Sequence, residues 1–230
     1  MRVLDDWLLT SARAAVHLPT ATAVIADVHL GYAEARHRGG EAVPGQSVAS
    51  VLNPLRRVVD LHHVRRLVVA GDLFEAGAVL SMVTELFAWC AAAGVELLGV
   101  VPGNHDRGLA ARATELSLYP EGVRLGDWCI VHGDRDLPDS AVVQGHEHPV
   151  ARWNDRVGGP CYLVSGRRLI LPAFSPDAAG VNVIRRKRWH AFRCCVISGE
   201  QVLDFGRLGE LEARMTNRDR QGALPDGRGS

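Results

Sequence analysis

Five short polar blocks carry residue types that bind metals and move protons. The blocks are Asp27-Val28-His29, Gly71-Asp72, Gly103-Asn104-His105-Asp106, His132-Gly133-Asp134 and Gly145-His146-Glu147-His148. Five of the ten histidines of the chain lie in them. An apolar, β-type run precedes each block, so we expect each block at the end of a buried strand. Loops at strand ends are held rigidly and can converge on one point. The sequence therefore predicts a single polynuclear metal site.

The donor atoms of these blocks are carboxylate oxygens, an amide oxygen and imidazole nitrogens. This set suits a borderline or hard divalent ion, such as manganese, iron or zinc, better than a thiolate-loving ion. At a strand end Asp27 and His29 point the same way, so they can share one ion. His146 and His148 repeat this spacing, and Glu147 between them should point away. One Asp-x-His pair alone would more simply be a hydrogen-bonded pair, but two such blocks together favour a shared ion.

The remaining blocks supply a bridge, a second ion site and a proton donor. Asp72 closes an apolar strand, where a buried carboxylate needs compensation. Bridging two cations is the strongest form of compensation, and capping the next helix is the alternative. Asn104 and His132 can serve a second ion. His105 is expected to act as an acid oriented by Asp106, because a carboxylate on one ring nitrogen fixes the tautomer of the ring.

The first half of the chain alternates between the elements that must position these residues. Strands are predicted at 24–26, 67–70 and 95–101. Helices are predicted at about 46–61, with Ser47 as the cap, and at 80–93, ended by Gly94. This alternation implies crossover connections and a largely parallel sheet.

The second half changes to short, closely spaced strands. They are predicted at 123–125, 128–131, 141–143, 161–164, 168–171, 191–197 and 201–205. We expect these strands to be antiparallel and the fold to be α/β, an α+β sandwich of two mixed sheets packed face to face with flanking helices. Residues 1–215 are predicted to form a single domain and residues 216–230 a disordered tail.

The composition limits the class of protein and of partner. Basic and acidic residues number 26 each, so the net charge gives no general attraction to polyanions. No apolar run approaches the roughly 20 residues that span a bilayer, so we expect no membrane partner. The chain starts with acids where a signal peptide carries bases. An odd number of cysteines without a Cys-x-x-Cys pair favours reduced, buried thiols. These features together predict a cytoplasmic protein.

The order D-x-H, GD, GNHD, HGD, GHxH resembles the calcineurin-like metallophosphoesterase superfamily. The resemblance implies the following ligands: Asp27, His29 and His148 for a first divalent metal, Asn104, His132 and His146 for a second, and Asp72 as the bridge. It also implies that His105 protonates the leaving group, and that the fold is the sandwich expected above. The two ions would most simply be Mn²⁺, with Fe, Zn, Ni and Mg left open.

Finer features resemble the small ICC-like bacterial and archaeal phosphoesterases. They are the segments 27–32 and 169–175 and a Gly-rich loop with Pro44. That group includes an endonuclease branch associated with DNA ligases. Many members of the superfamily extend the second block to GDxxD, whereas this chain has Glu75 at the last position. No role for Glu75 follows from the sequence.

The leading interpretation is a dinuclear, metal-dependent phosphodiesterase that cleaves P–O bonds with metal-activated hydroxide and with His105 as general acid. One alternative is a DNA-processing nuclease in repair, against which the neutral charge weighs mildly. Another is a non-catalytic scaffold, which fits less well because every expected ligand is present. Arg36 and Arg107 are candidate contacts to a phosphate-ester, nucleotide or nucleic-acid substrate, although a solvated arginine is the simpler interpretation of each.

Overall fold

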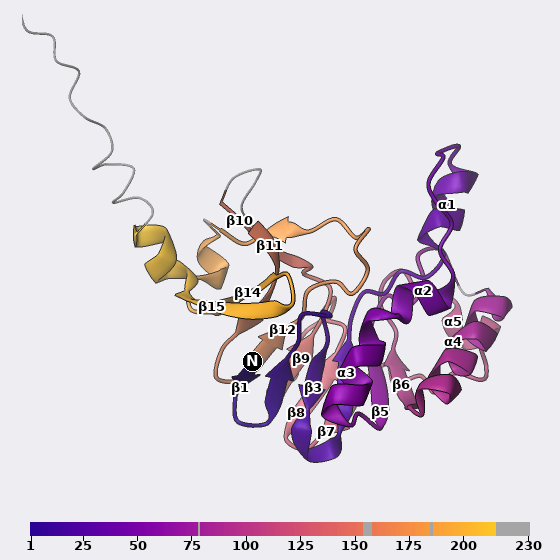
Figure 1. Ribbon diagram of the computed structural model, residues 1–230, viewed down its shortest axis with the longest axis horizontal. Helices are drawn as coiled ribbons and strands as arrows, with labels where there is room; N and C mark the ends of the chain where they lie inside the picture. Colours follow the sequence, from indigo (N-terminus) through magenta and orange to yellow (C-terminus); the bar gives the residue numbers. More distant parts are fainter. Residues whose placement is uncertain (78, 154–157, 185, 215–230) are drawn as a thin grey trace, which may run out of the picture.

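Two β-sheets packed face to face form the body of the molecule. The computed structural model describes residues 1–77, 79–153, 158–184 and 186–214, so the tail predicted at 216–230 lies outside the described residues. Helices cover the outer face of the first sheet (Figure 1). The expected two-sheet α/β sandwich with flanking helices is confirmed.

The first sheet has the strand order β1-β2-β3-β4-β5-β6 among the described residues. Its strands are β1 (Arg2–Val3), β2 (Trp7–Leu9), β3 (Ala15–His17), β4 (Thr22–Ile25), β5 (Arg66–Ala70) and β6 (Glu96–Val101). Strands β4, β5 and β6 are parallel, as predicted. Strands β1 to β4 form an antiparallel meander that the sequence analysis missed. These strands are too short to show a period of two residues.

The labelled helices are α1 (Tyr32–Arg38), α2 (Val48–Leu52), α3 (Pro54–His62), α4 (Leu80–Ala93) and α5 (Leu109–Arg112), with 3-10 turns at Leu18–Thr20 and Lys187–Trp189; residues 208–214 are also helical. The prediction of one helix over 46–61 is wrong, because Pro54 lacks an N–H and starts a new helix. The predicted caps are confirmed. The Ser47 hydroxyl accepts a hydrogen bond from the Ser50 N–H at 3.2 Å, and Gly94 ends α4 with φ 67°.

The second sheet has the order β13-β10-β11-β12-β9-β8-β7, and β14 pairs with both β11 and β15. Its strands are β7 (Val123–Leu125), β8 (Trp128–Val131), β9 (Ala141–Gln144), β10 (Pro149–Arg152), β11 (Gly158–Val164), β12 (Arg168–Ile170), β13 (Val181–Asn182), β14 (Arg193–Ser198) and β15 (Gln201–Arg207). The expectation of antiparallel strands is only partly right, since β8, β9 and β12 are parallel neighbours. As a result β8 and β9 end at the same edge of the sheet.

The core explains why the strands before the polar blocks are apolar throughout. In β4 and just beyond it, Val24 and Ala26 pack between the sheets, whereas Ala23 and Ile25 pack beneath the helices. A strand buried on both faces reads as a continuous apolar run, and polarity begins only where it ends, at Asp27. The five cysteines are buried and free, as predicted. Among the described residues, no helix is long and apolar enough to cross a membrane.

Candidate metal centre

The five polar blocks meet where β4, β5, β6, β8 and β9 end. Backbone hydrogen bonds join the loops to one another. The Asp27 N–H donates to the Gly71 carbonyl at 3.0 Å, and the Gly145 N–H donates to the His132 carbonyl at 3.0 Å. The convergence predicted from the sequence is therefore built by the main chain, before any side-chain contact is considered.

The backbone at this edge of the sandwich is strained. Five of the seven proposed ligands have a left-handed conformation, with φ of 55° at Asp27, 51° at His29, 45° at Asp72, 65° at His146 and 41° at His148. For a residue other than glycine this conformation costs about 1–2 kcal/mol. Such strain persists where the surrounding structure enforces it, and it is typical of functional sites. The fold therefore holds five proposed ligands in an unfavourable backbone conformation that directs their side chains toward the site.

Asp27, His29 and His148 form the first group of donors. Each offers an oxygen or nitrogen, and these atoms lie within 4.8 Å of one another. Asp27 Oδ2 lies 3.5 Å from His148 Nε2. His148 Nδ1 lies 3.1 Å from the Ala179 carbonyl, which can only accept, so Nδ1 carries the proton and Nε2 faces the site. Burial lowers the pKa of His148, but hydrogen bonding and attraction to Asp27 outweigh burial and raise it overall.

His132, Asn104 and His146 form the second group. His132 Nε2 lies 3.2 Å from Asn104 Oδ1 and 3.2 Å from His146 Nδ1. His132 Nδ1 lies 3.3 Å from the Ala70 carbonyl, so Nδ1 is again the donor and Nε2 has a free lone pair. The two groups contain all the residues that the sequence analysis assigned to the two ions except the bridge.

Asp72 lies between the two groups, at the end of β5. Its Oδ2 is 3.5 Å from His132 Nε2, and its Oδ1 accepts a hydrogen bond of 2.8 Å from the His105 N–H. Asp27, Asp72 and His132 also have donor atoms within 4.8 Å of one another. This central position is the one that a bridging carboxylate requires.

Three glycines make room for the close approach of the blocks. A Cβ on Gly71 would lie 1.9 Å from His132 Nδ1, and one on Gly103 would lie 2.2 Å from Asp72 Oδ1. A Cβ on Gly145 would lie 2.6 Å from Asp27 Oδ2. Each glycine therefore accommodates a proposed ligand that comes from a different block. This explains why glycine recurs beside the polar residues in the sequence.

The Asp106 side chain packs between the loops that carry the second and third polar blocks. Its buried carboxylate accepts hydrogen bonds from the N–H groups of Leu73, Phe74 and Gly103, at 3.0–3.1 Å. Burial raises the pKa of Asp106, and the three N–H donors oppose that rise. Among the described contacts, no hydrogen bond joins this carboxylate to the His105 ring. Asp106 therefore ties two loops together, and its role as the acid that orients His105 stays a prediction.

The acid nearest the His105 ring is Glu75, which the sequence analysis left without a role. His105 Nδ1 lies 3.1 Å from the Glu75 carbonyl and 3.9 Å from its Oε2. The same Oε2 lies 2.7 Å from His29 Nδ1. The only sequence signal was the departure from the GDxxD pattern, and it did not show which side chain Glu75 would contact.

The candidate substrate residues lie on exposed surface. Arg36, in α1, donates to the Tyr32 hydroxyl and pairs with Glu41, both at 3.0 Å. The hydrogen bond to Tyr32 and then the charge of Glu41 raise the pKa of Arg36. In Figure 1 α1 projects away from the sandwich. Arg107 is exposed beside Asp106. The structure thus brings neither arginine into the cluster of donors.

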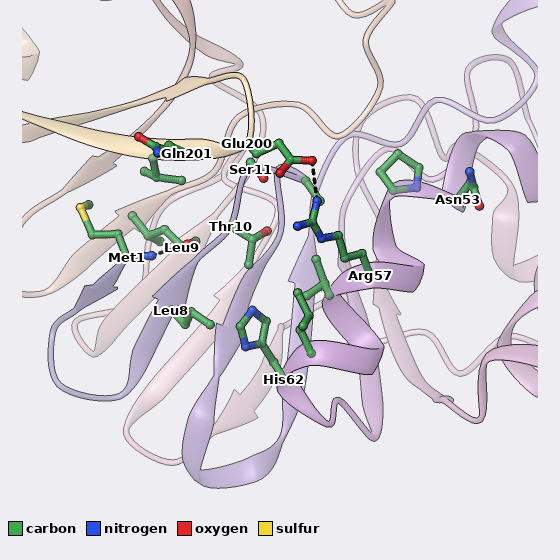
Figure 2. A pocket seen from close by; sticks show the side chains of 15 residues that line it. Met1, Leu8, Leu9, Thr10, Ser11, Asn53, Arg57, His62, Glu200 and Gln201 are labelled. Atoms are coloured by element: carbon green, nitrogen blue, oxygen red, sulfur yellow. Dashed lines mark hydrogen bonds and ion pairs between the residues drawn. The ribbon is translucent and has the colours of Figure 1, made fainter.

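Two of the cavities among the described residues lie beside the centre, and a larger one lies apart from it. A cavity of about 390 Å³ is lined by His29 and Arg38, and one of about 290 Å³ is lined by His132 and Arg135. A cavity of about 640 Å³ between β2, α3 and the turn from β14 to β15 has none of the proposed ligands in its wall. Figure 2 shows this third cavity, crossed by the 2.5 Å ion pair between Arg57 and Glu200. The first two cavities therefore adjoin the proposed metal ligands.

The donor set fits divalent cations. Among the described residues, Nε2 of His29 is buried without a hydrogen-bond partner. Around His132 Nε2, which is an acceptor, stand two further acceptor atoms, Asp72 Oδ2 and Asn104 Oδ1. Acceptors that crowd around acceptors need a cation between them, because buried polar atoms left unpaired are costly. The residues present thus could hold metal ions.

Comparison with known proteins identifies the fold. No family model matches the chain, and no curated protein matches it. Among solved structures, the chain is similar to the crystal structure of Pseudomonas putida nuclease MPE. The two are 21% identical, with a TM-score of 0.68 over 86% of this chain and 94% of that chain. The likeness therefore establishes that this chain has the two-sheet α/β fold of that nuclease.

Proposed function

We propose that this chain is a dinuclear, divalent-metal-dependent phosphodiesterase of the calcineurin-like superfamily, in the ICC-like group. The observation that carries the proposal is the meeting of seven donor residues from five strand ends in one strained cluster, of which Asp27, His29, Asp72 and His132 are buried. Carboxylate, amide and imidazole donors in this mixture favour Mn²⁺, Fe, Zn or Ni over thiolate-loving ions, and Mn²⁺ is the ion we propose.

The protein residues divide into three tasks. Asp27, His29 and His148 hold the first ion; Asn104, His132 and His146 hold the second; and Asp72 holds both. When bound, the two ions supply hydroxide from water and neutralise charge on the phosphate oxygens. The backbone carbonyls of Ala70 and Ala179 keep the protons of His132 and His148 on Nδ1, which leaves Nε2 for the ions.

His105 is the proposed proton donor. Its Nδ1 lies 3.1 Å from the Glu75 carbonyl, which can only accept a hydrogen bond. The exchangeable proton of an imidazolium is therefore the one on Nε2. The His105 side chain is 40% exposed, so it can reach a substrate. The backbone N–H of His105 donates a hydrogen bond to Asp72 Oδ1, which fixes His105 relative to the proposed bridge. These features support transfer of the Nε2 proton to the departing oxygen.

A nucleic-acid substrate is the second candidate, as in a DNA-processing nuclease. The similar structure is that of a nuclease, and cavities of about 390 and 290 Å³ adjoin the two groups of donors. A chain that continues on both sides of the scissile phosphate would use both cavities. Arg107 remains a proposed phosphate contact, since it is exposed directly after His105 and Asp106. Because the net charge of the chain is zero, we expect it to contact a short stretch of nucleic acid and not to bind a long stretch along a basic groove.

The test is hydrolysis by the purified chain after removal of metals with a chelator. We expect no turnover of bis(p-nitrophenyl) phosphate or single-stranded DNA until Mn²⁺ is added, and no recovery in Asp72→Asn. Glu200→Gln, at the distant cavity of Figure 2, is the matched control and should behave as the wild type. Absence of metal-dependent hydrolysis across phosphomonoesters, phosphodiesters, dinucleotides and DNA would overturn the proposal in favour of a non-catalytic scaffold.

A further inference from the structure

Glu75 occupies a place in the centre that no proposed ligand accounts for. Its Oε2 lies 2.7 Å from His29 Nδ1 and 3.9 Å from His105 Nδ1, and one donor atom of each of these three residues lies within 4.8 Å of the others. The Glu75 side chain is 24% exposed and that of His29 is 5% exposed. An acid so close to a buried imidazole has an electrostatic effect that solvent screens only in part.

The main chain fixes Glu75 beside His29. The His29 N–H donates to the Asp72 carbonyl at 2.9 Å, and the Leu30 N–H donates to the Leu73 carbonyl at 2.8 Å. The Glu75 N–H returns a hydrogen bond of 2.9 Å to the Leu30 carbonyl. The loops after β4 and β5 thus run side by side, with a parallel bridge between Leu30 and Phe74. This pairing holds the backbones of His29 and Glu75 close enough for their side chains to meet.

His29 differs from two other histidines of the centre in the partner of its Nδ1. His132 Nδ1 faces the Ala70 carbonyl and His148 Nδ1 faces the Ala179 carbonyl, whereas His29 Nδ1 faces the Glu75 carboxylate. In His132 and His148 this leaves Nε2 free. A carboxylate is a stronger acceptor than a carbonyl, and it makes the other ring nitrogen a better metal ligand.

We propose that Glu75 is a positioning residue for the first ion: its carboxylate holds the proton of His29 on Nδ1 and so presents Nε2 to the metal. This inference rests on the proposed function, because it presumes the metal centre. The Glu75 oxygen lies off the axis of the ring N–H, so the contact at 2.7 Å is not yet a hydrogen bond. Contacts of this kind commonly tighten when a catalytic site is loaded.

The first test compares metal affinities of the full chain by equilibrium titration with Mn²⁺. Glu75→Gln keeps the shape but removes the charge, and we expect about a 10–100-fold loss of affinity for one of two ions. Glu75→Asp keeps the charge and should retain more affinity than Glu75→Gln. Glu200→Gln is the control for removal of an acid far from the centre. Wild-type affinity for both ions in Glu75→Gln would overturn the inference.

The second test observes the His29 ring directly. Zn²⁺ has a filled d shell and no redox chemistry, so the Zn²⁺-loaded chain suits ¹⁵N NMR of the imidazoles. We expect a protonated Nδ1 in His29, with a resonance that shifts in Glu75→Gln. An Nδ1 that is bound to the metal, with the proton on Nε2, would contradict the inference. A wild-type chain that binds no divalent metal would instead refute the proposed function.

Discussion

His105 is the residue on which the proposed proton transfer depends. His105→Asn removes the proton on Nε2 but leaves the backbone N–H that binds Asp72. We expect turnover of alkyl phosphodiesters to fall about 10²–10⁴-fold, the usual contribution of a general acid. Turnover of p-nitrophenyl esters should fall less, because that leaving group needs little protonation. Both ions should remain bound, which metal analysis checks. Unchanged alkyl-ester turnover in the fully metallated variant would remove His105 from this role.

At the same scale, Asp106 and Glu75 mark where sequence reasoning was insufficient. Asp106 follows His105 directly, but its side chain turns to the N–H groups of Leu73, Phe74 and Gly103. Glu75 is thirty residues from His105 in the chain, yet its carbonyl lies 3.1 Å from the His105 ring. Adjacency in sequence does not fix the direction of a side chain in an irregular loop. The contact depends on how two loops pair, and no local pattern encodes that pairing.

Among the elements, the loops at the strand ends depend on glycines for their packing. Gly103→Ala would bring a Cβ to 2.2 Å from Asp72 Oδ1 and 2.5 Å from the Asp72 backbone nitrogen, which cannot easily move. We expect a loss of about 1–3 kcal/mol in the free energy of unfolding, the usual range for overpacking, together with weaker Mn²⁺ binding. Denaturant unfolding and metal titration measure these two effects.

The matched control for this substitution is Gly166→Ala, in the turn before β12. Nothing lies within 4 Å of a Cβ at that position. Replacing a glycine where alanine fits changes stability little or raises it by about 0.4–1 kcal/mol. Equal stability and equal metal affinity of the Gly103→Ala and Gly166→Ala variants would show that close packing at Gly103 is not needed for stability or for metal binding.

Element boundaries were predictable where the signal was local. The limits of α4 follow from apolar spacing and Gly94, and the end of β4 follows from the change to Asp27. The break at Pro54 follows from proline chemistry, although the apolar pattern continues across it. The parallel pairing of β8 with β9 was not readable, because strand direction depends on the path of the connecting residues 132–140.

At the scale of the whole molecule, the sandwich keeps its thiols out of solvent. Burial raises the pKa of the Cys90 thiol to about 11, and burial followed by the charge of Asp204 raises that of Cys195 to about 12. The reactive thiolate is therefore scarce at pH 8, and it increases only as the pH rises toward these values. We expect less than one fast-reacting thiol per native chain with a disulfide reagent, and five after denaturation. Rapid reaction of several thiols in the native chain would contradict this account of the core.

The architecture of the molecule was accessible from sequence because the fold repeats one arrangement, a buried strand followed by a polar block. Two sheets, their facing core and the edge where the blocks meet all follow from it. The short meander from β1 to β3 has no such block and was missed. The single-domain limits, 1–215, remain a prediction.

The central claim is that this chain binds two divalent ions through a shared Asp72. The most direct measurement is electron paramagnetic resonance of the metal-depleted chain during titration with Mn²⁺. We predict that two ions bind per chain and give a spin-coupled spectrum, and that Asp72→Asn abolishes the coupling. Binding of no ion, or of ions whose spectrum remains that of isolated Mn²⁺ at saturation, would contradict the claim.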